Sequence, residues 1–410
     1  MPRKAAAPQA ETPAKASASA SEKAFEAFAA KMDKTYGQGV FTAPISAVKY
    51  EVISTGSISL DYYLGCGGLP EGRIHEIWGP ESAGKSTLAA ICLREAQRKH
   101  PDKAVAIIDV EHRVDLAWLI AHGLLLGPTR FLLVKPITAE DVADQLKDIC
   151  KSGLFSAVVV DSVGAMLAKA AHEKDAGDST MGKDAQVVTR MVKLNAAMAE
   201  SKGTAILLIN QVRANFNYGS DTTTGGGFAL KHASTIKLFV KRATGDDSRL
   251  SVKIKGEDRV VGYKMSVKIE RNSVAPAYRT ASFFLITVPT EKYGPVGIDR
   301  VDEAVTVGLL SGVIKQSGAW YTTPDDQRYQ GRPAVVDALR QRPEVVELIR
   351  SMALETMADS VHPDVQDEEE SDGSAVDYED PSVPPTKGLA DLAARVKAVA
   401  SKAEAEAAST

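Results

Sequence analysis

The chain has 410 residues, of which 44% are hydrophobic and 25% are charged, and its formal net charge is −4. This composition is typical of a soluble globular protein, and the length allows a large core with smaller appendages. No apolar stretch approaches the roughly 20 residues of a membrane helix, so no membrane role is expected. Cys66, Cys92 and Cys150 show no metal-ligand spacing, which predicts a reducing cytoplasm as the location.

The beginning of the chain differs from the rest in composition. Residues 1–21 are rich in Ala, Pro, Ser and Lys without apolar periodicity, and we expect a disordered tail. Residues 22–52 are expected to hold an oligomerisation helix and a linker strand. The helix is predicted over Glu22–Tyr36, because apolar residues recur there at helical spacing: Phe25, Phe28, Ala29 and Met32.

The end of the chain is also distinct. Nine acidic residues and no Lys or Arg lie between Asp364 and Asp380, so removing them would change the net charge from −4 to +5. A basic body with an acidic segment is compatible with a polyanionic partner, although a solubilising tail explains the segment equally well. We expect residues 361–386 to be an acidic disordered linker and residues 387–410 an Ala-rich helix.

Between Ile53 and Val288, short apolar runs alternate with helical patterns, as in an α/β fold with a mostly parallel sheet. The clearest buried parallel strands are Arg73–Trp78, Ala104–Val110, Ala157–Val160 and Thr204–Ile209. Three later strands are expected to be antiparallel or at an edge: Thr235–Val240, Lys264–Ile269 and Ala281–Val288. A small helical region is predicted over Ala334–Ala358.

One segment predicts an ATP site. It follows a predicted strand, opens a predicted helix and matches the P-loop pattern G-x-x-x-x-G-K-[ST], in the residues Gly79, Pro80, Glu81, Ser82, Ala83, Gly84, Lys85, Ser86 and Thr87. Backbone N–H groups and the helix N-terminus would surround the phosphates. Lys85 would reach the β- and γ-phosphates, and the Ser86 hydroxyl would bind Mg²⁺.

Three polar residues follow other predicted strands and complete the site. Asp161 is a candidate to hold Mg²⁺ through water. Glu111 is a candidate general base for the attacking water. Gln211 could bind the γ-phosphate and report its presence to the segment that follows. An acid at a strand end is more often solvated, but the P-loop favours these functional interpretations.

Two Gly-rich segments lie downstream of these strand ends. Val212–Phe228 contains Arg213, Phe216 and Tyr218, and long loops inside compact domains are usually functional or disordered. Arginine with interleaved aromatic residues suits phosphate contact and base stacking or wedging on single-stranded nucleic acid, and two such segments together favour DNA binding controlled by ATP. Ala171–Lys183 is a second candidate loop and contains Met181 and Gly182. Either segment alone could be a mobile connection.

Together these motifs closely resemble the bacterial RecA family, over roughly residues 22–358. The resemblance is carried by several segments of the chain: Ser54–Asp61, Gly67–Ile74 running into Gly79–Thr87, Ile107–His112, Val158–Val163, Ile209–Arg213, Thr222–Gly226 and Ser317–Tyr321. It implies a RecA-like ATPase core over 53–290 with two DNA-binding loops, and a small C-terminal α/β domain over 291–360. The helix over 22–36 would dock on a neighbouring subunit.

The implied function is an ATP-dependent recombinase that forms helical filaments on single-stranded DNA and also engages double-stranded DNA. An SOS repressor and a single-strand-binding protein would be further partners. Asp115, Trp118 and Tyr293 would surround the adenine, and Arg271 would act catalytically across the subunit interface. The DNA contacts would come from Met181, Gly182, Arg213, Asn215, Phe216, Tyr218, Gly225 and Gly226.

The sequence departs from the family at one place. The family has two lysines, separated by an asparagine, that reach across the interface to ATP, but this chain has Arg271 and Ser273 at those positions. A filament scaffold that only binds ATP and DNA therefore stays an alternative to a recombinase. A ring helicase or clock-type ATPase is a further alternative, which the Thr/Gly-rich loop and the N-terminal helix disfavour.

Overall fold

The computed structural model describes residues 50–166, 183–214, 222–224, 230 and 232–361, together with five residues nearer the N-terminus. The chain divides into two compact units, residues 1–49 and 50–410. In the first unit the described residues are all helical, in agreement with the helix predicted over Glu22–Tyr36: Lys23, Ala27, Phe28, Lys31 and Lys34.

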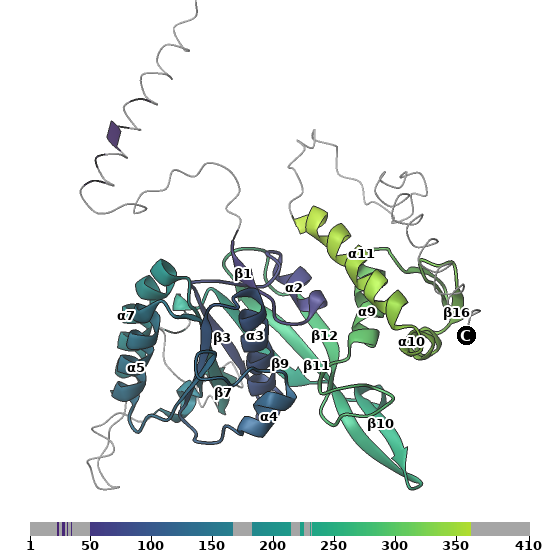
Figure 1. The fold of residues 1–410 in the computed structure, drawn as a ribbon, viewed down its shortest axis with the longest axis horizontal. Helices are drawn as coiled ribbons and strands as arrows, with labels where there is room; N and C mark the ends of the chain where they lie inside the picture. The colour runs from purple at the N-terminus through teal and green to yellow at the C-terminus, as the bar shows by residue number, and fades with distance from the viewer. Residues whose placement is uncertain are drawn as a thin grey trace, which may run out of the picture. The chain divides into compact units, whose positions relative to one another are not determined.

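The second unit holds an α/β core followed by a smaller C-terminal part (Figure 1). The core elements are β1 (Val52–Ile53), α2 (Ile58–Leu64), β2 (Leu69–Pro70), β3 (Ile74–Gly79), α3 (Lys85–Lys99), β4 (Ala104–Asp109), α4 (Leu116–Ala121), β5 (Phe131–Val134), α5 (Ala139–Ser152), β6 (Phe155–Asp161), α7 (Lys183–Lys202), β7 (Ala205–Ala214), β8 (Thr222–Thr224), β9 (Ile236–Arg242), β10 (Arg249–Ile254), β11 (Glu257–Asn272), β12 (Thr280–Ile286) and β13 (Gly297–Ile298). The C-terminal elements are α9 (Arg300–Leu310), β14 (Lys315–Ser317), β15 (Trp320–Thr322), β16 (Arg328–Gln330), α10 (Arg332–Arg340) and α11 (Pro343–Val361).

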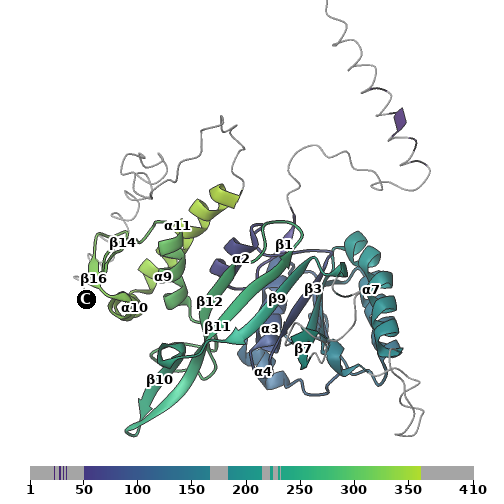
Figure 2. The same cartoon turned by 180° about the vertical axis from the view of Figure 1, so that it is seen from behind.

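The main sheet has the strand order β13-β12-β11-β9-β3-β7-β6-β4-β5, with β10 paired to β11 and β8 to β7. The strands from β9 to β5 are parallel, whereas β11, β12 and β13 continue the sheet in antiparallel fashion. Figure 2 shows β3, β9, β11 and β12 side by side. The predicted α/β fold with a mostly parallel sheet is confirmed.

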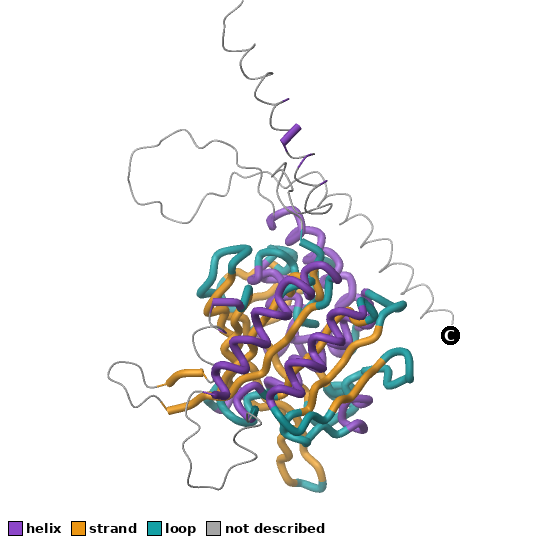
Figure 3. Tube along the Cα trace, turned by 90° about the vertical axis from the view of Figure 1, so that its left-hand side faces the viewer, coloured by secondary structure: helices purple, strands orange, loops and turns teal. Residues whose placement is uncertain are grey.

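Both faces of the parallel strands are buried, which explains their continuous apolar runs. In β4, Val105 and Ile107 belong to the cluster packed against α3, and Ala106 and Ile108 to the cluster packed against α5 and α7. Figure 3, viewed from the side on which α5 and α7 lie in Figure 1, shows helices crossing in front of the strands. Alternate side chains of one strand thus contribute to two cores.

Two predictions about the sheet were wrong in part. The strand predicted over Thr235–Val240 is β9, which lies between β3 and β11 rather than at an edge, and is parallel to β3. The loop predicted from Val212 is partly strand, because Val212–Ala214 pairs antiparallel with Thr222–Thr224. Tertiary pairing decides both cases, and the local residue pattern gives no sign of it.

The C-terminal part contains more than the predicted helical region. Helices α10 and α11 correspond to that region, and the three-stranded sheet β14-β15-β16 agrees with the small C-terminal α/β domain that the resemblance implies, whereas neither α9 nor the individual strands were predicted from the residue pattern. Their core includes Val305, Ile314, Val335, Leu339 and Ile349. Among the helices of the described part of the chain, none is both long enough and apolar enough to cross a membrane.

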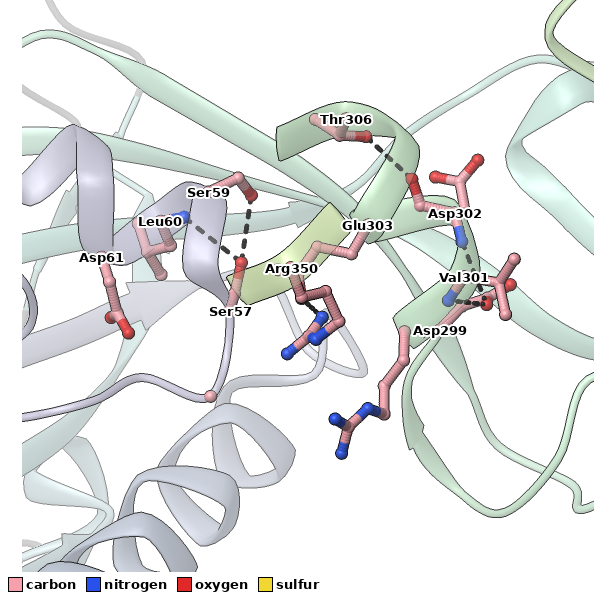
Figure 4. Close-up of polar contacts among 12 residues, drawn as sticks. Ser57, Ser59, Leu60, Asp61, Asp299, Val301, Asp302, Glu303, Thr306 and Arg350 are labelled. Carbon is pink, nitrogen blue, oxygen red and sulfur yellow. Dashed lines mark hydrogen bonds and ion pairs between the residues drawn. The ribbon is translucent and has the colours of Figure 1, made fainter. Parts of the chain in front are cut away.

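Buried polar residues lie on both sides of the contact between α2 of the core and α9 of the C-terminal part (Figure 4). The Asp61 carboxylate accepts hydrogen bonds from the Ser54 hydroxyl at 2.5 Å and from the Thr55 amide at 2.8 Å and hydroxyl at 2.7 Å. On α9, the Glu303 carboxylate lies 3.0 Å from the guanidinium of Arg350 on α11. Burial raises the pKa of Asp61 to about 7, and the negative charge of Glu303 adds to the rise, whereas the bonds from Ser54 and Thr55 oppose it.

This raised pKa predicts a dependence of stability on pH. Between about pH 4 and 7 the folded chain keeps a proton on Asp61 that the unfolded chain releases, so the free energy of unfolding falls as the pH rises, by up to about 1.4 kcal/mol for each pH unit. Asp61→Asn is neutral at every pH and keeps an acceptor oxygen. Urea unfolding should show the stability of the parent falling relative to Asp61→Asn from pH 5 to 7 and levelling off above about pH 8.

The matched control is Asp102→Asn, since Asp102 is exposed. Its stability should stay parallel to that of the parent from pH 5 to 8. If the stability of Asp61→Asn also stayed parallel to that of the parent from pH 5 to 8, Asp61 would be ionised in the folded chain throughout this range.

Candidate nucleotide-hydrolysis site

The site lies where the parallel pairing of four neighbouring strands, β3, β7, β6 and β4, ends. Gly79 at the end of β3 is the register partner of Gln211 in β7, and Asp109 at the end of β4 is the partner of Asp161 at the end of β6. The carboxyl ends of parallel strands meet at one edge of the sheet. The strands therefore bring the P-loop, both predicted acidic positions and Gln211 to the same edge.

The P-loop segment begins at Gly79, the last residue of β3, and continues into α3, whose first residue directly follows Gly84. Gly84 has φ +97°, and a Cβ there would lie 2.8 Å from the Tyr263 hydroxyl and still closer to the Met265 methyl group. A Cβ on Gly79 would meet the carbonyl oxygen of Val240. Tyr263 could not be predicted from the sequence, because only folding brings β11 against the P-loop.

Lys85 is the first residue of α3, and its ammonium group lies against the P-loop backbone. Its Nζ donates hydrogen bonds to the carbonyl oxygens of Gly79 at 3.0 Å and Pro80 at 2.7 Å. Burial lowers the pKa of Lys85, while the carboxylates of Asp161, Glu111 and Glu81 oppose that shift. The ammonium group is thus held at the N-terminus of α3, where an anion is favoured by the helix dipole and by unpaired N–H groups.

The two predicted metal ligands are in contact. The Ser86 hydroxyl donates to the Asp161 carboxylate at 2.7 Å. Burial raises the pKa of Asp161, as do Glu111 and Asp109, whereas Ser86 and Lys85 lower it. Hydroxyl and carboxylate oxygens suit Mg²⁺, which in nucleotide sites takes few protein ligands. Accordingly, no group of three or more His, Cys, Asp or Glu within the described ranges could hold a metal by itself.

Glu111 follows β4 and is contacted from two other strands. Its Oε1 accepts hydrogen bonds from the Ser162 hydroxyl at 2.6 Å and from Gln211 Nε2 at 2.8 Å. Its Oε2 lies 3.3 Å from Nη1 of Arg113. The fold therefore brings together Glu111 and Gln211, as predicted, and adds Ser162 and Arg113. Ser162 directly follows Asp161, so its position next to a predicted ligand was the one signal available.

The three predicted adenine residues have separate surroundings. Asp115 caps α4, and its carboxylate accepts from the backbone N–H of Ala117 at 2.8 Å. The Trp118 ring packs on His122, with 4.3 Å between ring centroids. Tyr293 contacts other elements, since it lies 4.6 Å under the Arg340 guanidinium and its hydroxyl donates to the Ser251 carbonyl. The adenine contacts of all three stay predictions.

Arg271 lies at a β-bulge in β11. The register passes from Ile269 to Arg271 against consecutive residues of β9, so Glu270 is the extra residue. Bulges redirect side chains, and the Glu270 carboxylate accepts a hydrogen bond from the Trp78 indole at 2.7 Å.

A buried polar chain continues from Trp78 back to β7. The Lys237 ammonium lies 4.6 Å from the Trp78 ring centroid and 3.2 Å from the carboxylate of Glu76, which is fully buried. Glu76 in turn accepts from the Asn210 amide at 3.0 Å, and the Asn210 side-chain oxygen accepts from the Gln211 N–H. These contacts connect Gln211 on β7 to the bulge before Arg271 on β11.

The predicted DNA-binding residues are mostly outside the described part of the chain: Met181, Gly182, Asn215, Phe216, Tyr218, Gly225 and Gly226. The backbone of Arg213 lies in β7, two residues beyond Gln211. Thr222–Thr224 form β8 next to it. The described geometry thus extends from the P-loop edge to the start of the second predicted loop.

Two family models and several known proteins match most of this chain, and all of them point to one family. The family model of the RecA N-terminal domain matches residues 23–289, and that of the RecA C-terminal domain matches residues 302–357. Proteins named RecA are 35% identical in Thermus thermophilus, covering 85% of this chain and 98% of the relative, and 36% identical in Saccharopolyspora erythraea, covering 87% and 98%. The Paracoccus denitrificans protein of that name is 36% identical over 80% of this chain and 88% of its own.

The contact between β11 and the P-loop predicts the effect of a methyl group on Gly84. Gly84→Ala should weaken ATP binding by about 10-fold or more, because left-handed backbone costs alanine roughly 1–2 kcal/mol and its Cβ would displace Met265 or Tyr263. Titration with a fluorescent ATP analogue would measure the loss. Gly127→Ala is the control, since its Cβ would meet only Arg130, at 3.6 Å. Equal affinities for Gly84→Ala and the control would contradict the prediction.

Proposed function

The chain belongs to the RecA family of DNA-dependent ATPases that act in strand exchange, and on this premise we propose that Glu111 is its general base and that Gln211 couples hydrolysis to DNA. The hydrogen bond of 2.8 Å between Gln211 and Glu111 carries the proposal. Gln211 lies on β7, the strand that leads into the second predicted DNA-binding loop. Loss or gain of the γ-phosphate would therefore alter the contacts of the base and the position of this loop together.

The P-loop would bind the phosphates of the nucleotide. Backbone N–H groups at the start of α3 and the Lys85 ammonium would hold the β- and γ-phosphate oxygens. Ser86 and Asp161 would hold Mg²⁺, which when bound neutralises charge that develops on the phosphates. The hydrogen bond between the Ser86 hydroxyl and Asp161 supports this assignment, because it joins the two oxygens that the ion would require.

Hydrolysis would proceed by attack of water on the γ-phosphate. Glu111 would accept the proton of this water, which is the role of a general base. Ser162 and Gln211 would orient the carboxylate, since both donate to Oε1. When the γ-phosphate is present, the Gln211 amide could donate to it in place of Glu111, which would connect the nucleotide state with the position of β7.

Filament formation follows from family membership, and the contacting surfaces are proposed here. Exposed leucine and isoleucine side chains occur on and around α4 and the edge strand β5: Leu116, Ile120, Leu125, Leu132 and Ile137. Apolar surface of this kind marks association sites. The predicted helix of a neighbouring subunit, with its apolar face of Phe25, Phe28 and Met32, is the proposed occupant. Arg271 would approach the nucleotide of a neighbour.

DNA binding also follows from family membership, and the residues are proposed from the resemblance. Arg213 would contact phosphate, and Met181 and Phe216 would separate groups of bases. The cytoplasm is the proposed location, with an SOS repressor and a single-strand-binding protein as further partners. A basic body, apart from the acidic segment between Asp364 and Asp380, supports a polyanion as ligand.

ATP turnover with and without single-stranded DNA tests the assignment of Glu111. The parent should hydrolyse ATP faster when DNA is present. Glu111→Ala should retain ATP affinity and lose about 10²- to 10⁴-fold in kcat, which is the usual contribution of a general base. Turnover of Glu111→Ala at the parental rate would mean that Glu111 is not the base.

A mixing experiment tests whether Arg271 acts on a neighbour. Glu111→Ala and Arg271→Ala should each be nearly inactive on DNA. In an equal mixture, about a quarter of ordered neighbours would combine an intact Glu111 with an intact Arg271 across a head-to-tail interface. Turnover should therefore recover well above the sum of the separate proteins. If the mixture gave only that sum, Arg271 would not act in trans.

A further inference from the structure

The segment between β4 and α4 holds an arginine next to the proposed base. The buried Asp109 carboxylate accepts hydrogen bonds from the backbone N–H groups of Arg113 and Val114, both at 3.1 Å. His112, which directly precedes Arg113, has φ +55°, in the left-handed region. The backbone of Arg113 is therefore fixed by the strand end, although its side chain is exposed.

The Arg113 side chain extends back toward the site. Its Nη1 lies 3.3 Å from Oε2 of Glu111, and the two side chains are 80% and 17% exposed. Ser162 and Gln211 both donate to the other oxygen, Oε1. The guanidinium thus faces the carboxylate oxygen on the side away from these two donors.

The Arg113 side chain is 80% exposed, so solvent screens its ion pair with Glu111 and the pair adds little to stability. Stability therefore does not explain the position of Arg113. The excess of negative charge around the P-loop gives a better explanation for the position of Arg113. The carboxylates of Glu81, Glu111 and Asp161 all act on Lys85, the cation of the P-loop. ATP adds further negative charge there. A second cation within reach of the γ-phosphate would stabilise the charge of the transition state.

We propose that Arg113 supplies this second positive charge at the γ-phosphate, from the same chain as the P-loop, and so compensates for Ser273. A guanidinium carries five donors in a planar fork and binds phosphate oxygens in pairs. Because the Arg113 side chain is exposed, it can exchange that carboxylate for the γ-phosphate at little cost. The exchange also releases Oε2 of Glu111 toward the attacking water, so the proposal rests on Glu111 being the base.

The first test is ATP turnover on saturating single-stranded DNA. Arg113→Ala should lower kcat by about 10- to 100-fold and leave KM for ATP within about threefold, because the charge acts mainly in the transition state. Affinity for ADP, which lacks the γ-phosphate, should not change. Arg113→Lys should retain part of the activity, since it keeps the charge but loses the fork.

Arg98→Ala is the matched control. Arg98 is likewise an exposed arginine that pairs with a mostly buried glutamate, with Nη1 2.9 Å from Oε1 of Glu95 and exposures of 62% and 15%. This pair lies on α3, in its last turns, and away from the P-loop. Arg98→Ala should turn over ATP at the parental rate.

The second test restores the missing charge from the other side of the interface. Ser273→Lys introduces the lysine that the family has at this position. In the Arg113→Ala background it should recover most of the lost kcat, because either cation would serve the same phosphate. Failure of this rescue, with Arg113→Ala impaired, would overturn the compensation between the two positions.

Two results would overturn the role of Arg113 itself. If Arg113→Ala turned over ATP at the parental rate, the contact with Glu111 would be no more than a surface ion pair. If Arg113→Ala turned over ATP faster, Arg113 would restrain the base rather than assist it. These results are distinguishable from failure of the proposed function. An inactive Glu111→Ala with a fully active Arg113→Ala rejects only Arg113, whereas a fully active Glu111→Ala rejects the base assignment.

Discussion

The parallel register of four central strands is the constraint on which the site depends. Gly79 lies opposite Gln211, and Asp109 lies opposite Asp161. A shift of one residue would turn every side chain of a strand to the other face and exchange its two cores. Because alternate residues of these strands are buried on both sides, such a shift is strongly disfavoured. The positions of the polar strand ends are therefore set by apolar packing far from the chemistry.

Buried charge adds a second constraint on the same strands. Glu76 has no exposed surface, and it is paired with Lys237 on β9 and bonded to Asn210 on β7. Removing one partner of a buried pair typically costs about 3–5 kcal/mol, because the other charge is left uncompensated. The pair therefore fixes β3 between its two neighbours. The Trp78–Glu270 hydrogen bond extends the same fixation to β11, where Arg271 follows.

The sequence was most informative where function depends on contiguous residues. The P-loop, Glu111, Asp161 and Gln211 lie at one edge of the sheet, because each of these motifs includes or follows a buried parallel strand, whereas their roles stay predictions. The sequence was least informative where contacts join distant segments. Tyr263 reaches Gly84 from β11, and β8 forms only by pairing with β7. Short polar strands such as β14 and β16 carry no apolar alternation, so no periodicity could indicate them.

Arg113 shows why spacing alone did not identify a functional side chain. In the sequence it is a single arginine in a connection between strand and helix, with no partner in view. Its proposed role depends on Asp109, whose carboxylate holds the backbone of this connection, and on Glu111, which its side chain contacts.

A cation supplied by the same chain has a different effect on the control of hydrolysis from one supplied by a neighbouring subunit. Charge supplied across an interface makes hydrolysis conditional on assembly, whereas charge supplied by Arg113 is present in every subunit. With Arg271 kept and Ser273 in place of a lysine, the proposed site divides this requirement between the two sources, so part of the control over hydrolysis passes from the filament to the single chain.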